Sequence, residues 1–398
     1  MRRDMRFSRG ALMGASVFVA TACWSQSLTW LGVLPGGSSS RANAVAADGT
    51  VVVGISSSAS GTRAFRWTRE TGMVTLDPYD GTRIEALAAS ADGNVIVGFA
   101  YDSNNLEFAF RWTPETGVQR LVPNATQSWA SGVSTDGSVI VGWASNLGVF
   151  FWTPHTGAVP SGSIVGGLYH IGISADGSTI VGSIVEDGVH RAARWTRESG
   201  SEVLDTLGGR QNHAFACSAD GSVVVGRIED QSYWWQAFRW TRETGMVGLG
   251  TLGGNTSTAF SVSGDGSVVV GTSTATGLWA FRWTPTRGME NLNITYAGLL
   301  TGLSYLSSAR AVSPDGRYIV GVGFNAETER QEAFLLDTGF PLRGDVNRDG
   351  CVDDADLMAV LFAFGERGYR NADIDWNGAI DDGDLLQVLF HFGDGCEQ

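Results

Sequence analysis

Two acidic segments near the C-terminus repeat one pattern of oxygen-bearing side chains. Residues 345–356 and 373–384 place Asp or Asn at positions 1, 3 and 5, glycine at position 6, and Asp at positions 9 and 12. This spacing is typical of a calcium loop, in which glycine permits the sharp turn and position 7 offers its backbone carbonyl. The expected ligands are Asp345, Asn347, Asp349, Cys351 (backbone), Asp353 and Asp356, and then Asp373, Asp375, Asn377, Ala379 (backbone), Asp381 and Asp384.

An Asp-Gly pair alone is also typical of an ordinary hairpin turn on the surface. Here, however, two complete copies occur, and each precedes an amphipathic run, at 357–364 and 385–392. We therefore predict two bound Ca²⁺ ions, one in each loop, with a short helix after each loop. Because the ligand carboxylates repel one another, this segment should order fully only with metal bound.

The segment 344–393 resembles a type I dockerin, a small calcium-dependent module that binds a cohesin domain. Both loops end in Asp, as in that family, but positions 10 and 11 lack its hydroxyl-containing pair, and the spacer 367–372 is short. The resemblance implies a cohesin-like partner, with some other cell-surface component as the alternative. It also implies that the two ends of the module meet. Cys351 and Cys396 would then form a disulfide worth about 4 kcal/mol, and free buried thiols are the alternative.

The N-terminus has the pattern of a bacterial export signal. Four arginines in the first nine residues precede a short apolar run at 11–22, and Ala20-Thr21-Ala22 suits signal-peptidase cleavage. We predict a signal peptide at 1–22 and a secreted or cell-surface protein, with a lipoprotein attached through Cys23 as the alternative. This run is too short to span a bilayer, and no other segment is long and apolar enough to be transmembrane.

Composition excludes several classes of chemistry. The formal net charge is −14, and all 27 basic residues are arginine. Without lysine there is no Schiff-base or amine chemistry, and the acidic balance argues against a nucleic-acid partner.

Most of the chain consists of repeats. The pattern S/A-x-D-G-x-x-x-V-G recurs at intervals of 40 to 50 residues. A second pattern, Phe-Arg-Trp-Thr, follows at 65–68, 110–113, 238–241 and 281–284, with altered copies at 150–153, 193–196 and 334–337. The repeated aspartates, for which we expect a role in turns, are Asp48, Asp92, Asp136, Asp176, Asp220, Asp265 and Asp315.

Each repeat divides into four short strands, and seven such units predict a mainly β fold, a seven-bladed β-propeller over 28–342. The small α-helical calcium-binding module, EF-hand-like or dockerin-like, follows at 344–398. The seventh unit lacks its fourth strand, but residues 31–34 resemble the fourth strand at 249–252. We therefore expect the N-terminal strand to close the ring, since closure removes open sheet edges.

Residues 28–337 resemble the HAF-repeat extracellular proteins, whose repeats carry these same Ser-Ala-Asp-Gly and Phe-Arg-Trp-Thr patterns. The resemblance brings no catalytic residue with it. Alternation along the strands predicts that Trp234 and Trp279 share the buried face of the repeat tryptophans, and that Trp235 lies on the other face.

No known catalytic motif appears in the chain. We therefore expect an exported, non-enzymatic repeat protein that presents a binding or structural surface and is anchored through its calcium module. The alternatives are a dockerin-bearing polysaccharide-active enzyme, a glycoside hydrolase or lyase with a carboxylate pair gathered from distant blades, or a propeller that binds extracellular glycan without turnover.

Overall fold

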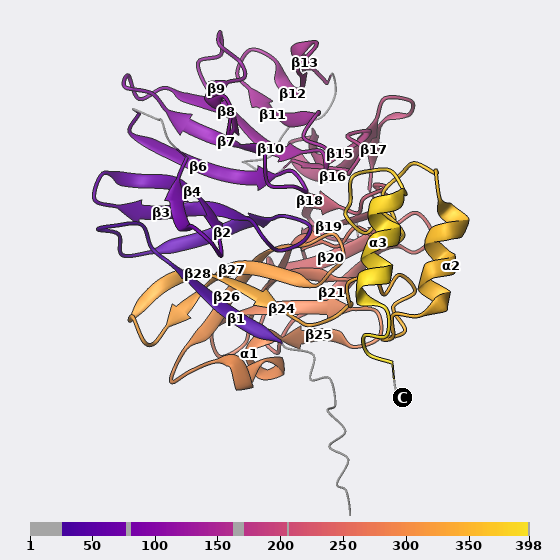
Figure 1. Cartoon of the computed structure of the whole chain (residues 1–398). Coiled ribbons are helices and arrows are strands. Elements are labelled where there is room, and N and C mark those ends of the chain that lie inside the picture. Colours follow the sequence, from indigo (N-terminus) through magenta and orange to yellow (C-terminus); the bar gives the residue numbers. More distant parts are fainter. Residues whose placement is uncertain (1–25, 77–80, 162–170, 205–206, 397–398) are drawn as a thin grey trace, which may run out of the picture.

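The computed structural model describes residues 26–76, 81–161, 171–204 and 207–396. Seven four-stranded antiparallel sheets form a ring, and α2 and α3 lie together on one side of it (Figure 1). The mainly β, seven-bladed propeller predicted from the repeats is confirmed. The expected signal peptide at 1–22 and Cys23 lie outside the described residues.

Each blade uses its strands in chain order, from the central channel outwards. The first four blades are β2 (Ser40–Val45), β3 (Val52–Ser58), β4 (Gly61–Thr68) and β5 (Gly72–Thr75); β6 (Arg83–Ala89), β7 (Ile96–Tyr101), β8 (Glu107–Thr113) and β9 (Gly117–Arg120); β10 (Ser128–Val133), β11 (Ile140–Ala144), β12 (Gly148–Thr153) and β13 (Gly157–Pro160); and β14 (Gly172–Ile173), β15 (Thr179–Glu186), β16 (Val189–Thr196) and β17 (Gly200–Val203).

The last three blades follow the same order, except that the seventh takes its outer strand from the N-terminus. They are β18 (Gln211–Cys217), β19 (Val223–Glu229), β20 (Trp235–Thr241) and β21 (Gly245–Gly250); β22 (Ser257–Val262), β23 (Val269–Thr274), β24 (Leu278–Thr284) and β25 (Gly288–Asn291); and β26 (Tyr305–Val312), β27 (Tyr318–Asn325), β28 (Arg330–Asp337) and β1 (Ser27–Gly32).

Closure by the N-terminal strand is confirmed, since β1 pairs antiparallel with β28. The strand lies a few residues earlier than expected, because Gly32 adopts a positive φ of 74° and the chain then turns away. Gly250 at the end of β21 has the same conformation, with φ of 78°. Only glycine adopts such angles at little cost, so the glycine sets where both outer strands end.

The Asp-Gly pairs form the turns between the first and second strands of each blade. In six of the seven turns, a serine two residues before the aspartate stabilises the turn by hydrogen bonds. In the second blade, the Ser90 hydroxyl donates to Asp92 Oδ1 (2.5 Å) and accepts from the Val95 amide (2.9 Å). The same contacts recur at Ser134, Ser174, Ser218, Ser263 and Ser313. The aspartates therefore have the turn-forming role expected of them.

The two repeat patterns meet between neighbouring blades. The arginine of Phe-Arg-Trp-Thr donates from Nε to the carbonyl of the next blade's Asp-Gly glycine in three places: Arg66 to Gly93, Arg194 to Gly221 and Arg239 to Gly266, at 3.4, 2.8 and 3.1 Å. The phenylalanine of the same pattern is fully buried in the blade core, for example Phe65 and Phe238. One short motif thus builds both the core and the blade-to-blade contact.

One prediction from alternation was wrong. Trp234 is 45% exposed, because it precedes β20 and belongs to a tight turn in which the Asp230 amide donates to the Trp234 carbonyl (2.9 Å). Period-two alternation holds only inside a strand. Trp235, the first residue of β20, lies against the Arg227 guanidinium, 4.1 Å from its ring centroid.

The helices are few and short: α1 (Leu292–Thr295), the 3-10 helix η1 (Ala297–Leu299), α2 (Asp354–Ala363) and α3 (Asp382–His391). The last two each begin three residues earlier than the predicted amphipathic runs, because Asp353 and Asp381 cap their N-termini. Within the described ranges, no helix combines the length and the apolar character that a membrane crossing requires.

Candidate metal centre

The first acidic loop is closed by its last carboxylate. Asp356 accepts hydrogen bonds from the amides of Val346 (2.8 Å), Asn347 (3.0 Å) and Asp353 (2.9 Å). Asp345 at position 1 accepts from the amides of Asp349 and Gly350, both at 3.1 Å. The two carboxylates therefore hold the loop in a tight turn by accepting hydrogen bonds from its backbone amides.

The second loop repeats this arrangement 28 positions later. Asp384 accepts from the amides of Ile374 (2.6 Å), Asp375 (3.3 Å) and Asp381 (3.0 Å). The position-6 glycines have φ of 96° at Gly350 and 88° at Gly378, as the predicted turn requires. Asp353 and Asp381 at position 9 accept from the amides of Ala355 and Gly383, both at 2.8 Å, so they cap the helices.

Among the described residues, three carboxylates come within ligand distance of one another in the second loop and not in the first. Ligand atoms of Asp373, Asp375 and Asp384 lie within 4.8 Å of one another. In the first loop position 3 is Asn347, whose Nδ2 donates to Asp349 at 2.9 Å. Asn377 at position 5 of the second loop likewise donates to Asp375 at 3.0 Å. Carboxylate and amide oxygens of this kind are ligands that calcium accepts.

These loops bury negative charge. Asp356, Asp373 and Asp384 are fully buried and Asp345 is 5% exposed. Burial raises the pKa of Asp345 to about 6 and that of Asp373 to about 7. Among the residues that the structure describes, no arginine or histidine forms an ion pair with these four carboxylates; the pairs nearby in sequence are Arg343–Asp48, Arg348–Asp265, Arg370–Glu366 and His391–Asp394. A buried carboxylate without a cation is costly, so the donor set fits a divalent ion.

The ends of the module are joined. Cys351 and Cys396 form a disulfide with Cα atoms 4.5 Å apart, closing a separation of 45 residues. Beside it, the Val352 amide donates to the Asp394 carbonyl (2.9 Å) and the Val352 carbonyl accepts from Gly393 (2.8 Å). Cys351 and Ala379 occupy position 7 of the two loops, the position whose backbone carbonyl was predicted as a ligand.

Sequence reasoning missed the role of position 4 in each loop. Arg348 and Trp376 both have positive φ, 62° and 58°, and both reach the propeller. The Arg348 guanidinium pairs with Asp265, and it donates to Ser267 Oγ and the Asp315 carbonyl, each at 3.1 Å. It thus bridges the Asp-Gly turns of the sixth and seventh blades. No pattern in the sequence indicates the positive φ of Arg348, which depends on the folded loop.

Trp376 covers one mouth of the ring's central channel. It is 3% exposed and packs in a cluster with Ala47, Ala175 and Ala219, each the residue before an Asp-Gly pair. Tyr369 of the same module stacks beside it, with ring centroids 6.4 Å apart and an interplanar angle of 6°. Small side chains at this mouth make room for the indole.

A circle of backbone hydrogen bonds lies beneath Trp376. The amide of the residue before each Asp-Gly pair donates to the matching carbonyl of the next blade, in six successive links of 2.7 to 2.9 Å. At the seventh position stands Pro314, which has no N–H to donate. The residues of this circle are Ala47, Ala91, Thr135, Ala175, Ala219, Gly264 and Pro314.

Helices α2 and α3, and the residue that follows each of them, carry apolar side chains that are exposed to solvent. Phe362 and Phe390, at equivalent positions 28 residues apart, are 78% and 79% exposed. The remaining exposed apolar residues form the same pairs in both units: Met358 with Leu386, Leu361 with Leu389, and Phe364 with Phe392. We call these eight residues the paired apolar faces.

Comparisons with known proteins address the fold. No family model matches the sequence, and no curated protein matches it. An oligogalacturonate lyase from Vibrio parahaemolyticus is similar in structure, with a TM-score of 0.54 and 14% identity over 78% of this chain and 93% of that one. TolB from Acinetobacter baumannii (0.44, 13%, 73% and 81%) and a putative TolB from Agrobacterium tumefaciens (0.40, 14%, 77% and 91%) also match. At 14% identity, the likeness to the lyase shows a shared propeller fold alone.

Proposed function

We propose that this chain is an exported, non-enzymatic propeller that presents a binding surface and is anchored at the cell exterior through a calcium-dependent, dockerin-like module. The observation that carries the proposal is the pair of matching acidic loops, in which the buried carboxylates form no ion pair with any arginine or histidine that the structure describes. The HAF-like repeats and the export-signal pattern at 1–22 support a secreted or cell-surface location. The alternative form of this proposal is a lipoprotein held at the membrane surface through lipidated Cys23.

Two Ca²⁺ ions would complete the module. The ligands proposed are Asp345, Asn347, Asp349, Asp353 and Asp356 with the Cys351 carbonyl, and Asp373, Asp375, Asn377, Asp381 and Asp384 with the Ala379 carbonyl. Calcium takes roughly six to eight oxygens, so side chains and one carbonyl per loop account for most of each shell. Each ion would neutralise the negative charge of the carboxylates that are buried in the loop before α2 or α3 and in its first turn.

The proposed partner is a cohesin-like protein on the cell surface. The paired apolar faces supply what such docking needs, since exposed apolar clusters on a small module are typical of interaction sites. The faces are equivalent, because both helices carry Phe and Leu at the same places relative to their loops. Either face can therefore engage one partner, while the propeller stays free to present its own surface.

Binding to a purified type I cohesin domain, measured by surface plasmon resonance with calcium or with EGTA, tests this proposal. Single substitutions F362S or F390S should retain binding through the other face, and the double variant should lose it. Ile294 and Leu303 are exposed apolar residues of the propeller, so I294S/L303S is the matched control and should bind normally. Binding that persists in EGTA, or in the F362S/F390S variant, would contradict the proposal.

A polysaccharide-active enzyme or a glycan-binding propeller is the second candidate, and the fold shared with a structure described as an oligogalacturonate lyase favours it mildly. Among the described residues that line the channel, the one carboxylate is Glu85; it accepts from Arg41 (2.6 Å) and Arg83 (3.1 Å), so it is not a free general base. Release of unsaturated or reducing products from polygalacturonate by the purified protein would favour the enzyme. Binding without product would favour the glycan-binding propeller.

A further inference from the structure

The central channel of the propeller contains a cavity of about 660 Å³, a volume typical of small-molecule sites. It extends from Ala47 and Ala91, beneath Trp376, to Arg83 and Tyr101 towards the other mouth. The Arg83 side chain is 47% exposed, so that end is open to solvent. A ligand would therefore enter from the mouth that faces away from the calcium module.

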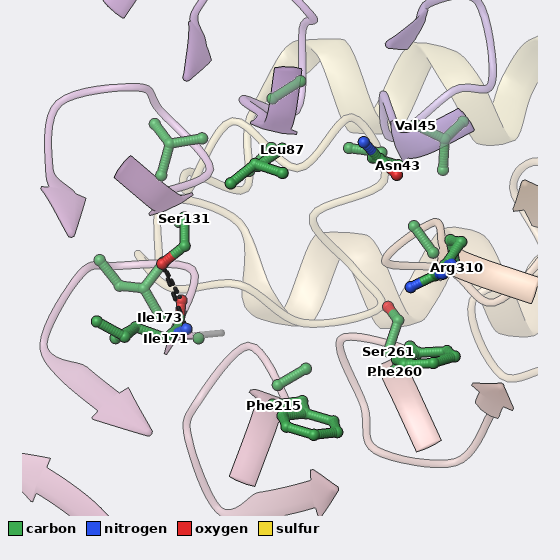
Figure 2. A pocket seen from close by; sticks show the side chains of 18 of the residues that line it. Asn43, Val45, Leu87, Ser131, Ile171, Ile173, Phe215, Phe260, Ser261 and Arg310 are labelled. Carbon is green, nitrogen blue, oxygen red and sulfur yellow. Dashed lines mark hydrogen bonds between the residues drawn. The ribbon is translucent and has the colours of Figure 1, made fainter. Parts of the chain in front are cut away.

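Each blade contributes one side chain to a belt around this cavity, the residue five positions before its Asp-Gly aspartate. Six of these residues lie on inner strands, and Ile171 directly precedes β14. Six of the seven belt residues carry no charge, and the seventh is Arg310 on β26. In Figure 2 the Arg310 guanidinium points into the pocket, and the rings of Phe215 and Phe260 lie on its lower side. The belt therefore offers one cation next to an apolar, aromatic wall.

The other polar belt side chains already have partners. Asn43 donates to the Ala86 carbonyl (2.8 Å) and accepts from Arg41 Nε (3.0 Å). Ser131 donates to the Ile171 carbonyl (3.0 Å) and accepts from the Ile171 amide (3.3 Å), the contact drawn in Figure 2. A ligand rich in hydroxyl groups would find few free partners at this level of the channel.

Arg310 differs from them. Its Nε is buried without a hydrogen-bond partner, and no ion pair joins its guanidinium to any residue that the structure describes. The guanidinium lies over Phe260, 4.5 Å from the ring centroid. Burial, with a further contribution from the charge of Arg41, lowers the pKa of Arg310 to about 10. Stacking on an aromatic face leaves the planar fork of N–H donors available to a carboxylate.

The charges around Arg310 do not neutralise it. Arg41 and Arg83 share the single carboxylate of Glu85, so this group of three arginines and one glutamate has a net charge of +2. The whole chain, in contrast, has a formal charge of −14. A positive site within low-dielectric walls attracts and retains an anion more strongly than an exposed site does.

We propose that the channel binds a small organic carboxylate with an apolar or aromatic body, its carboxylate paired with Arg310 and its body against Phe215 and Phe260. The Arg310 cation favours a carboxylate over a neutral molecule. The polar side chains of the belt already have hydrogen-bond partners and the wall is aromatic, so the site favours an apolar body over an acidic sugar. This inference is independent of calcium binding and of anchoring, and no enzymatic step is involved.

Calorimetric titration of the full chain, with calcium present, tests the proposal with phenylacetate as the probe. Phenylacetate should bind with a dissociation constant of about 1 mM or tighter. Phenylacetamide, a neutral molecule of the same shape, and galacturonate, an acidic sugar, should each bind about tenfold more weakly or worse. Absence of phenylacetate binding, or equal binding of either comparison molecule, would overturn the proposal.

A substitution locates the site. R310M keeps an unbranched apolar stem but removes the guanidinium, and it should weaken phenylacetate binding about tenfold or more. The matched control is R111M, because Arg111 also lies over an aromatic ring, that of Trp152, and also has a buried Nε without a partner, but neither residue lines the cavity. Unchanged binding in R310M, or equal weakening in both variants, would refute the assignment. If R310M fails to fold, the comparison of phenylacetate with phenylacetamide in the wild-type protein decides.

Discussion

A Cβ atom added to Gly264 would lie 2.2 Å from Cη2 of Trp376. The six equivalent residues of the other blades all carry a Cβ, and four of them are alanine. The propeller therefore accepts a side chain at this position in every other blade. The glycine in the sixth repeat makes room for an aromatic ring that comes from the C-terminal module.

This contact predicts a coupling between two substitutions. G264A should destabilise the protein by about 1 to 3 kcal/mol, since an added methyl group overlaps the indole. W376A should cost about 3 to 5 kcal/mol by leaving a cavity at the mouth of the channel. Because the overlap disappears with the indole, G264A should cost much less in the W376A background. Chemical unfolding of the four proteins in calcium measures this cycle.

The control for that cycle is G298A, since a Cβ on Gly298 meets no atom within 4 Å. Its effect should stay within about 0.5 kcal/mol. If G264A were equally destabilising with and without Trp376, the strain would belong to the propeller backbone and not to the contact.

Arg348 should contribute more to stability than an ordinary surface arginine. It is largely buried against Asp265 and bonds two Asp-Gly turns, so R348M removes the charged donor of the Asp265 carboxylate and a donor to the Asp315 carbonyl. We expect a loss of about 1 to 3 kcal/mol. R370M removes the exposed Arg370–Glu366 pair of the same module and should change stability by less than about 1 kcal/mol. Equal effects in thermal unfolding would refute the proposed bridge.

Removal of calcium should release the module from the propeller. The loops that would bind the ions also hold Arg348 and Trp376 in their left-handed conformations, so a loop that loosens withdraws both contacts. EGTA should therefore increase protease cleavage in the module and expose Trp376, which changes tryptophan fluorescence.

Two substitutions test which carboxylates hold the ions. D384N removes a buried ligand and should lower the calcium stoichiometry from two to one in calorimetry. D382N, on the same helix at loop position 10, is the control and should retain two sites. Two calcium ions bound to D384N, or no heat with the wild-type chain, would contradict the assignment.

The turn aspartates predict loss of stability in acid. Burial alone would raise the pKa of Asp220, but hydrogen bonds from Ser218 and Ser222 outweigh it, and the folded-state pKa lies below the ordinary 3.8. A lowered pKa stabilises the fold above pH 3.8, and this contribution is lost as the pH falls through the folded-state value.

D220N should therefore be less stable than the wild type by about 1 kcal/mol near neutral pH, and the difference should shrink in acid. Thermal unfolding at several pH values measures the gap. The exposed Glu243 supplies the control, because E243Q should leave stability unchanged at each pH. A gap that widens as the pH falls would show that the sign is wrong.

Much of the fold is predictable because each repeat contains sequence patterns that determine its own turns and strands. Asp-Gly needs the positive φ that Gly93 and its equivalents adopt, and Phe-Arg-Trp-Thr buries its aromatic residues by alternation. The closing strand β1 was recognisable because it copies β21 down to the terminal glycine. Trp234 shows the limit of this reasoning, since alternation does not extend past the end of a strand.

The sequence alone determined the number of blades and the two acidic loops, because these depend on residues close together in the chain. It also identified the closing strand, because residues 31–34 repeat the pattern of 249–252. Only the tertiary structure decided that the module covers one mouth of the channel and that Arg310 stands alone in the belt. Arg348 meets Asp265 across a separation of 83 residues, and Arg343 meets Asp48 across 295. No local pattern encodes such contacts, because they form only when the closed propeller brings all seven turns together beneath the module.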